Sequence, residues 1–227
     1  MSDAPARPRE TESWVFDLDN TLYPADSTVY DAIGTRMTQY VARVAGLDFV
    51  AAEKLQERYF FEYGATVVGL MRHHEIDAAH FMHDVHDVDL SIVPPDLDLN
   101  ALIAALPGRK FVFTNGGAEY ARRMLKQLRL EAHFDAVVDI ETTGLIPKPQ
   151  PEAYRHLVEF CAIDPHRAVL IEDTLRNLEP AAALGFETVL VGAVHPDPKP
   201  AYLHHTAHDL KSFLRSCLQI DRPTPAA

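Results

Sequence analysis

The chain has 227 residues, and its 47% hydrophobic and 24% charged residues are ordinary fractions for a globular protein. At roughly 150 residues per domain, this length allows one large domain or a core with an inserted module. The formal net charge of −12 argues against a nucleic-acid polymer as partner, because no basic patch would offset phosphate repulsion. A small anionic substrate, which needs only local positive charge or a metal ion, is compatible with it.

The first thirteen residues, MSDAPARPRETES, contain no apolar core of a signal peptide. No apolar run approaches the length needed to cross a membrane, so we expect no membrane partner. The two cysteines, Cys161 and Cys217, form neither a disulfide framework nor a metal-ligand spacing. We expect two buried thiols in a cytoplasmic protein. The oligomeric state is left open.

The first predicted element is a buried strand, SWVFDLD (13–19), that ends in acidic residues. About ninety residues with helical patterning follow, the clearest stretches being 31–44, 51–64 and 77–86. A loop of that length is improbable in a compact domain, where most connections run to about six residues. We therefore expect an inserted, all-helical module.

The inserted module begins near Pro24 and ends near Pro94-Pro95. The predicted division assigns 24–99 to a helical cap domain, and 1–23 together with 100–227 to the core domain.

Strands and helices alternate from residue 110 onward. Strands are predicted at 110–115, 134–140, 168–173 and 186–192, and helices at 118–130, 151–161, 175–184 and 209–218. Such alternation indicates a parallel sheet covered by helices on both faces. The predicted fold class is α/β, with a Rossmann-like parallel sheet core and the helical cap inserted into it.

Three of the predicted strands end in polar residues at their carboxyl edge: Asp17 and Asp19, then Thr114 and Asn115, then Glu172 and Asp173. That edge of an open parallel sheet is where ligands bind. The motifs converge if the first strand is central, and Lys148, just before a predicted helix, can reach the same edge. Taken singly, each motif also fits an ordinary turn, a helix N-terminus or an exposed surface position.

Four motifs occur in order: DLDNTLYP (17–24), FTNGG (113–117), KPQPEAY (148–154) and LIEDTLRNL (170–178). The set resembles the haloacid dehalogenase (HAD) superfamily of phosphotransferases, over roughly residues 13–23 and 105–195. The helical insertion is similar to the helical cap of that superfamily. Within it, the segments 58–77 and 83–87 resemble the branch that contains pyrimidine 5′-nucleotidases.

This resemblance implies transfer of a phosphoryl group from a small phosphorylated metabolite. The reaction needs an in-line nucleophile, an acid for the leaving oxygen and positive charge around the phosphoryl oxygens. Asp17 can attack phosphorus and form an aspartyl-phosphate. Asp19, two residues on, points to the same side because side chains of a strand alternate. It can protonate the leaving alkoxide and later deprotonate the attacking water.

The phosphoryl oxygens need partners of their own. Thr114 offers a hydroxyl group, and the backbone amides of Asn115 and Gly116 can form a small anion-binding nest. Lys148 balances the negative charge of the nucleophile and the phosphate. We therefore predict catalytic roles for Thr114 and Lys148, and phosphate binding by both of them with Asn115 and Gly116.

Three carboxylates and a phosphate would repel one another, and a hard divalent cation such as Mg²⁺ relieves this repulsion. By resemblance, its ligands are the carboxylates of Asp17 and Asp173 and the main-chain carbonyl of Asp19. Glu172 is expected to act without coordinating the ion directly, and Asn177 to brace the loop.

Candidates for contact with the leaving group come from the cap, because its inner face must select the substrate. We single out Tyr63, Arg72 and His73, for which the alternatives are exposed polar positions or packing inside the cap.

The leading functional hypothesis is a Mg²⁺-dependent phosphomonoesterase, foremost a pyrimidine nucleoside 5′-monophosphate nucleotidase. Alternatives are a phosphatase of phosphoglycolate or a sugar phosphate, a phosphomutase, and a 2-haloacid dehalogenase, which would need neither a metal nor a second acid. A non-catalytic binding protein is a further alternative. The sequence does not distinguish a phosphomutase from a hydrolase, because the difference depends on how the cap admits water.

Overall fold

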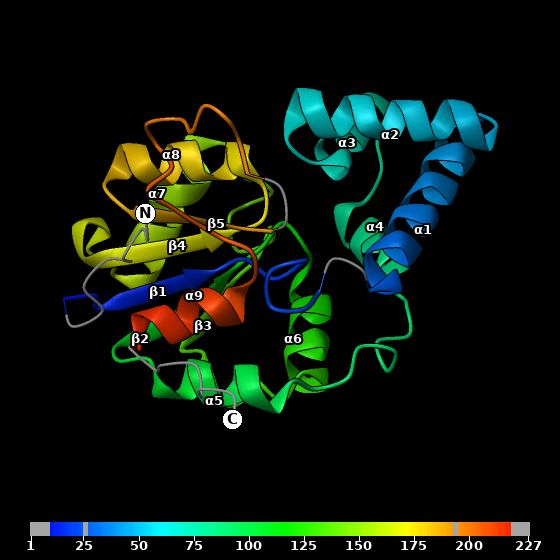
Figure 1. Ribbon diagram of the computed structural model, residues 1–227. Coiled ribbons are helices and arrows are strands. Elements are labelled where there is room, and N and C mark those ends of the chain that lie inside the picture. The colour runs from blue at the N-terminus through cyan, green and yellow to red at the C-terminus, as the bar shows by residue number, and fades with distance from the viewer. Residues whose placement is uncertain (1–9, 25–26, 193–194, 219–227) are drawn as a thin grey trace.

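The computed structural model describes residues 10–24, 27–192 and 195–218. The elements in chain order are β1 (Ser13–Phe16), α1 (Thr28–Ala45), α2 (Phe49–Tyr63), α3 (Thr66–His74), α4 (Ala78–Val85), α5 (Leu97–Ala105), β2 (Arg109–Phe113), α6 (Ala118–Gln127), η1 (Glu131–His133), β3 (Ala136–Val138), α7 (Pro151–Cys161), η2 (Pro165–Arg167), β4 (Ala168–Glu172), η3 (Leu175–Asn177), α8 (Leu178–Leu184), β5 (Glu187–Val191), β6 (His205–Ala207) and α9 (Leu210–Cys217) (Figure 1). Over these residues, no helix combines the length and apolar character needed to cross a membrane.

The six described strands form one sheet in the order β3-β2-β1-β4-β5-β6, and every neighbouring pair is parallel. The predicted α/β fold class is confirmed, with β1 central between β2 and β4. In the register of these strands, Phe16 at the end of β1 lies opposite Val112 and Ile171. The carboxyl ends of the three strands therefore meet at one edge.

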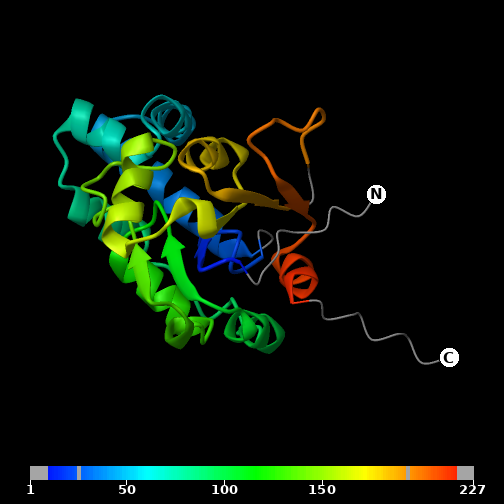
Figure 2. The ribbon, with the colours of Figure 1, turned by 90° about the vertical axis from the view of Figure 1, so that its left-hand side faces the viewer.

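Helices cover both faces of the sheet because the side chains of each strand alternate. Trp14 and Phe16 pack on one face, in a buried cluster with residues of α5, α6 and α9. Val15 points to the other face, where α7 and α8 supply the partners. Figure 2 shows the sheet between these two helical layers. Buried on both faces, β1 is apolar throughout and ends where polar residues begin.

Helices α1 to α4 form the cap and share a buried apolar cluster that also includes Ile140 of the core. Val29 and Ile33 of α1 belong instead to the apolar cluster around β1. Asp48 and Asp77 cap α2 and α4 by accepting hydrogen bonds from the backbone amides of Ala51 and Ala79. Gly69 in α3 lies directly against the ring of Tyr59 in α2. A Cβ atom at this position would come within 2.3 Å of Tyr59 Cγ, so the two helices approach as they do because residue 69 is glycine.

The segment that leads from the cap back to the core runs beside α6. Arg123 donates hydrogen bonds to the carbonyls of His86 and Val88, at 3.1 and 2.9 Å, and Gln127 donates to that of Val93 at 2.9 Å. These bonds fix the end of the cap segment on a helix of the core.

Helix α5 packs with the core rather than with the cap. Its buried residues Leu99, Leu102 and Ile103 belong to the same cluster as β1 and α9. Two ion pairs strengthen the contact with α9, Lys211 with Asp96 at 2.6 Å and Arg215 with Asp98. The predicted division between residues 99 and 100 falls inside this helix.

Several boundaries differ from the sequence prediction. β1 ends at Phe16, before both aspartates, and β3 covers only the middle of the predicted strand 134–140. α3, α5 and β6 were not predicted individually. Cys161 and Cys217 are free and buried, as expected.

Candidate active site

Three chain segments meet just beyond the carboxyl ends of β1, β2 and β4. The Asp17 amide donates to the Ile171 carbonyl at 2.9 Å, which continues the β1–β4 pairing by one residue. Thr114 is fixed in the same way, by a 3.0 Å bond from its amide to the Val138 carbonyl. Asp17 and Thr114 are therefore placed by the sheet itself, and each is almost fully buried.

Lys148 reaches this edge from the segment before α7. Its Nζ donates to Asp17 Oδ1 at 2.6 Å, to the Phe113 carbonyl at 2.8 Å and to Glu172 Oε1 at 3.0 Å. Only 2% of its surface is exposed, so these three acceptors take the place of water. Although burial alone would lower the pKa of Lys148, Asp17 and Glu172 raise it, and the amine stays charged.

Asn115 holds the backbone of Lys148 at two points. Its Oδ1 accepts a hydrogen bond from the Lys148 amide at 2.8 Å, and its Nδ2 donates to the Lys148 carbonyl at 3.1 Å. The amide of Gly116 donates to Thr114 Oγ1 at 2.9 Å. In this structure the Asn115 side chain therefore orients the lysine, and the Gly116 amide has an internal acceptor.

Glu172 is saturated with donors. Oε1 accepts from Lys148 and from Asn177 Nδ2, and Oε2 accepts from the amides of Asp173 and Thr174, at 2.9 and 3.3 Å. Burial alone would raise its pKa, but Lys148 and these hydrogen bonds hold the pKa of Glu172 below the ordinary value. Glu172 is therefore an ionised anchor for the lysine and for the loop that follows β4.

Asp17, Glu172 and Asp173 each offer an oxygen within 4.8 Å of the other two. Burial, followed by repulsion from Glu172, raises the pKa of Asp17 well above its ordinary value, although Lys148 opposes the shift. The same two causes raise the pKa of Asp173 to about 7. The single ammonium group of Lys148 thus leaves this cluster with excess negative charge.

The donor set of this cluster fits a hard divalent cation. Carboxylate oxygens are the ligands that Mg²⁺ prefers in proteins, and a cation would relieve the repulsion that raises the two pKa values. Asn20 donates its Nδ2 to Asp173 Oδ2 at 3.3 Å, while its buried Oδ1 has no hydrogen-bond partner. Each oxygen of Glu172 accepts two hydrogen bonds. The oxygens of Asp17 and Asp173 accept one each, from Lys148, Thr21, Asn20 and Thr174. Asp17 and Asp173 are therefore the carboxylates that keep lone pairs for an ion.

Asp19 occupies a different environment from Asp17. It lies in a turn after β1, where the Leu22 amide donates to the Leu18 carbonyl at 3.0 Å and Asn20 has a φ of +61°. The strand alternation used in the sequence prediction therefore does not extend to Asp19. Its Oδ1 accepts hydrogen bonds from two tyrosine hydroxyls, those of Tyr23 and Tyr120, each at 2.6 Å.

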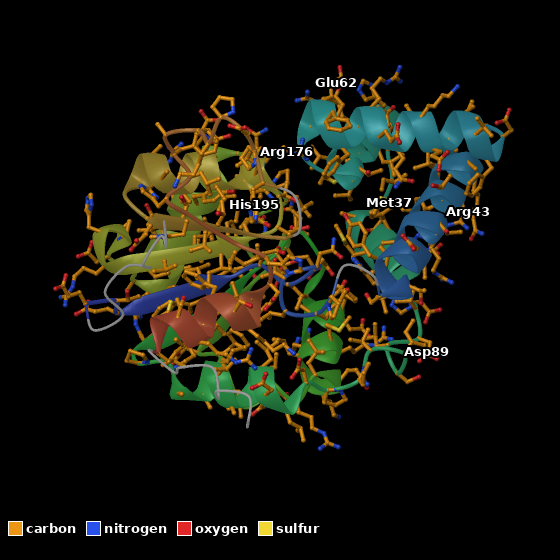
Figure 3. All side chains as sticks on the ribbon, in the orientation of Figure 1. Met37, Arg43, Glu62, Asp89, Arg176 and His195 are labelled. Atoms are coloured by element: carbon orange, nitrogen blue, oxygen red, sulfur yellow. The ribbon has the colours of Figure 1, made fainter. Side chains whose placement is uncertain are left out.

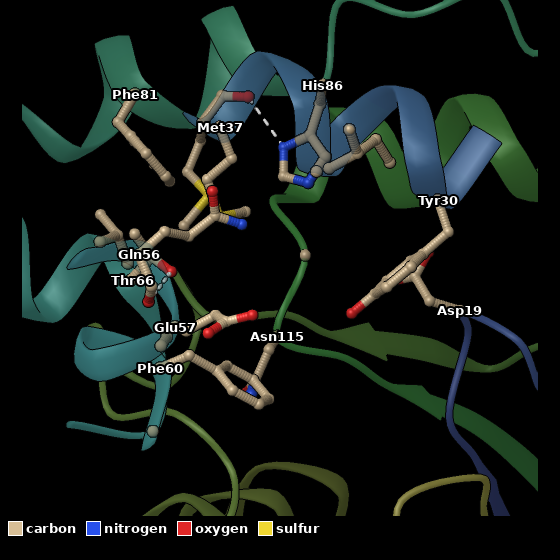
Figure 4. A pocket seen from close by; sticks show the side chains of 17 residues that line it. Asp19, Tyr30, Met37, Gln56, Glu57, Phe60, Thr66, Phe81, His86 and Asn115 are labelled. Carbon is tan, nitrogen blue, oxygen red and sulfur yellow. Dashed lines mark hydrogen bonds between the residues drawn. The ribbon is translucent and has the colours of Figure 1, made fainter. Parts of the chain in front are cut away.

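A cavity of about 220 Å³ opens between Asp19 and the cap (Figure 4). Its floor includes Asp19, Asn115 and Gly116 of the core. Its cap walls are mainly apolar or aromatic, with few polar groups, and are formed by Tyr30, Ile33, Gly34, Met37, Gln56, Glu57, Phe60, Gly64, Ala65, Thr66, Val67, Phe81, Met82 and His86. Figure 3 shows Met37 on the core-facing side of the cap and Arg43 on its outer side.

The predicted cap residues Tyr63, Arg72 and His73 are brought together, but they do not line this cavity. The Tyr63 hydroxyl and His73 Nε2 lie 2.8 Å apart, and the Arg72 guanidinium carbon lies 5.2 Å from the centre of the Tyr63 ring. Arg72 and His73 are exposed, and both contact Tyr63 on the cap.

One further contact joins the cap to the loop after β4. The guanidinium carbon of Arg176 lies 4.0 Å from the centre of the Phe60 ring and 5.5 Å from that of Phe61. Arg176 follows the acidic pair Glu172 and Asp173 by only a few residues.

Sequence reasoning missed both tyrosines that bind Asp19. Tyr23 follows Asp19 by four residues, a spacing that brings them together only because the chain turns there. Tyr120 lies on the apolar face of α6, beside Ala121 and Met124, where the helical pattern predicts core packing. The signal that could have identified Tyr120 is that it is the aromatic residue of an otherwise aliphatic helix face.

The fold and site together define a class of protein: an α/β core with a helical cap, in which the central parallel strand brings a lysine-paired carboxylate to the sheet edge. Residues 14–185 match the sequence profile of the haloacid dehalogenase-like hydrolases, and the chain belongs to this family.

One relative matches most of this chain. Phosphate metabolism protein 8 of Saccharomyces cerevisiae is 27% identical over 194 residues, which cover 77% of this chain and 60% of the yeast protein. The chain thus matches less than two thirds of that relative's length.

Two solved structures show the same fold. L-2-haloacid dehalogenase from Xanthobacter autotrophicus is 16% identical, with a TM-score of 0.59 over 93% of this chain and 100% of the other. A HAD phosphatase from Thermococcus onnurineus is 19% identical, with a TM-score of 0.59 over 92% of this chain and 98% of the other. Since a dehalogenase and a phosphatase match equally well, the fold alone does not choose between the two reactions.

Proposed function

We propose that the chain is a Mg²⁺-dependent phosphomonoesterase that acts through an aspartyl-phosphate, most favourably on pyrimidine nucleoside 5′-monophosphates. The observation that carries the proposal is the buried contact between Lys148 Nζ and Asp17 Oδ1 at the end of the central strand. A carboxylate nucleophile is effective when its negative charge is held in place and aimed at the substrate. When bound, Mg²⁺ would offset the repulsion between the carboxylates and the phosphoryl oxygens.

In the first step, an oxygen of Asp17 forms a bond to phosphorus while the ester P–O bond breaks. Asp19 gives a proton to the departing alkoxide, which leaves as an alcohol. In the second step, water attacks the phosphorus of the aspartyl-phosphate, and Asp19 accepts the proton of that water. The acyl-phosphate bond breaks, inorganic phosphate is released, and the Asp17 carboxylate is restored.

The remaining residues stabilise the charge of the phosphoryl group. We assign this role to Lys148, the Thr114 hydroxyl and the amides of Asn115 and Gly116. The Gly116 amide would exchange its bond to Thr114 Oγ1 for one to the substrate. Glu172, tied to Asn177, keeps Lys148 in position.

The cavity lining supports a leaving group that contains an aromatic ring and carries no second negative charge. Among the described residues that line it there is no arginine or lysine, whereas Glu57 contributes a carboxylate. Figure 4 shows Glu57 and Phe60 directed from α2 toward Asn115 of the core. Phosphoglycolate would bring its own carboxylate to this wall, while an uncharged pyrimidine nucleoside would not.

We assign contact with the leaving group to Gln56, Glu57 and Phe60. Tyr63, Arg72 and His73, the candidates from the sequence, are not among the residues that line this cavity.

The proposal is tested with purified protein and a panel of UMP, CMP, AMP, phosphoglycolate and a hexose phosphate, measuring phosphate release with and without Mg²⁺. We expect the nucleotides to be preferred, with the pyrimidines first. Acid quenching during turnover should trap phosphate on the unmodified protein, and mass spectrometry detects it. Asp17→Asn should abolish both turnover and this trapped phosphate. Asp89→Asn, a matched change at a surface loop of the cap connection, should leave both unchanged.

Two results would defeat the proposal. Full activity of Asp17→Asn would exclude Asp17 as the nucleophile. Release of chloride from 2-chloropropionic acid, without hydrolysis of any phosphate ester, would identify a dehalogenase. Comparable rates on the whole panel would leave a phosphatase but remove the nucleotidase assignment.

A further inference from the structure

Two tyrosine hydroxyls converge on one oxygen of Asp19. Tyr23 comes from the turn after β1 and Tyr120 from α6, ninety-seven residues later in the chain, and their hydroxyl oxygens lie 3.1 Å apart. Both donate to Asp19 Oδ1 at 2.6 Å. No bond from a described residue is present at Asp19 Oδ2, and Asp19 lies at the edge of the cavity.

The two phenols are permanent donors. Tyr23 and Tyr120 are 3% and 1% exposed. Burial, followed by the charge of Asp19, raises the pKa of both hydroxyls far above the ordinary value for tyrosine. Each therefore keeps its proton, and each directs it to the carboxylate.

The rings are also fixed by packing. Tyr120 stacks on the ring of His86, with centroids 4.5 Å apart and an angle of 17° between the planes. The Nδ1 of His86 is in turn 2.8 Å from the Met82 carbonyl at the end of α4. Tyr23 is buried among the residues that cover β1. Neither hydroxyl can leave Asp19 without disturbing a packed ring.

We propose that Tyr23 and Tyr120 are positioning residues that fix Asp19 through Oδ1, so that Oδ2 alone exchanges protons with the leaving oxygen and the attacking water. The inference rests on the function proposed above, because it assigns a task to two residues that never touch the substrate. A carboxylate in a turn would otherwise sample several rotamers, and proton transfer requires an approach within hydrogen-bond distance.

This role predicts a dependence on the leaving group. An alkyl ester such as UMP needs a proton when its alkoxide departs. The p-nitrophenolate ion leaves without one, so formation of the aspartyl-phosphate from p-nitrophenyl phosphate does not need a positioned acid. Hydrolysis of that intermediate needs Asp19 as a base for either substrate.

The test compares Tyr23→Phe, Tyr120→Phe and the double variant, which keep the rings and remove the hydroxyls. Tyr40→Phe is the matched control, since it removes a buried tyrosine hydroxyl that lies 3.0 Å from His80 inside the cap. Thermal unfolding of each variant establishes that it is folded. Steady-state rates are measured on UMP, and rapid-quench rates on p-nitrophenyl phosphate.

On UMP, we expect kcat of each single variant to fall by about tenfold or more, a part of the 10²–10⁴-fold that a general acid contributes, with little change in KM. On p-nitrophenyl phosphate, the initial burst should keep its rate while the steady state slows. Tyr40→Phe should behave as the unmodified protein.

The positioning role would be overturned if the burst rate on p-nitrophenyl phosphate and kcat on UMP fell by the same factor, or if neither fell. Such a result would not touch the proposed function, which fails separately if Asp17→Asn remains active. If the double variant does not fold, the two single variants decide.

Discussion

The Nζ of Lys148 lies 2.6 Å from Oδ1 of Asp17, although 131 residues separate the two in the chain. Both side chains are almost completely buried, so neither charge has water as an alternative partner. Removing one partner of a buried pair costs about 3–5 kcal/mol, because the other charge is left uncompensated.

Lys148→Met should therefore lower the free energy of unfolding by about 3 kcal/mol or more, as measured by urea denaturation. Asp17→Asn combined with Lys148→Met should be less destabilised than the sum of the single changes, because the contact couples them. Strict additivity of the two changes would contradict the pair as an energetic unit.

Magnesium should stabilise the protein in the absence of substrate. Binding to the native state alone adds about 2.7 kcal/mol at a hundredfold excess over Kd, and Tm should rise with Mg²⁺ concentration. Asp173→Asn, which removes an available carboxylate of the cluster, should weaken this response strongly. Asp89→Asn should respond as the unmodified protein does, and an equal response of Asp173→Asn would place the ion elsewhere.

Gly69→Ala should destabilise the cap. The added Cβ would fall 2.3 Å from Tyr59 Cγ, and overpacking of this kind costs about 1–3 kcal/mol. Gly34→Ala is the matched control in α1, where the new Cβ would have no heavy atom within 4 Å apart from the neighbouring backbone of its own helix. It should raise stability by about 0.5–1 kcal/mol through helix propensity. Similar effects of both changes on urea denaturation would refute the close approach of α2 and α3.

His86 should make the protein less stable in mild acid. Burial lowers its pKa, although Asp19 opposes the shift, so the unfolded chain binds a proton near pH 6 that the folded chain does not. Stability therefore rises with pH across this window and is lost as pH falls below about 6.5, with a limiting slope of about 1.4 kcal/mol per pH unit.

His86→Phe tests this directly, because it retains a ring to stack on Tyr120 and removes the titrating group. The variant should lose the Met82 hydrogen bond but show a shallower decline of stability between pH 6.5 and pH 5. Parallel curves for the two proteins would show that His86 does not contribute to the slope.

The sheet could be predicted from the sequence because its strands are short, apolar and followed at once by polar residues. Convergence of Asp17, Thr114 and Asp173 required β1 to be central, and the strand order meets this condition. The individual roles of these residues, the magnesium site and the cytoplasmic location remain predictions.

Three features escaped sequence reasoning for physical reasons. Helix α5 follows Pro94-Pro95, which suggested a connection, although Asp96 caps its first turn. Strand β6 has only three residues, too few for a period to show. The cavity lining depends on how the cap packs over the core, and local periodicity carries no information about that contact.

The contact of Arg176 with Phe60 has a consequence for how the cap can move. A cation–π pair at a partly exposed site is worth about 0.5–1 kcal/mol, so separating the two surfaces there costs little more than thermal energy. The same arginine sits on the loop that gathers the acidic residues. At this point the cap is therefore held to the loop after β4 by a contact weak enough to break and re-form readily.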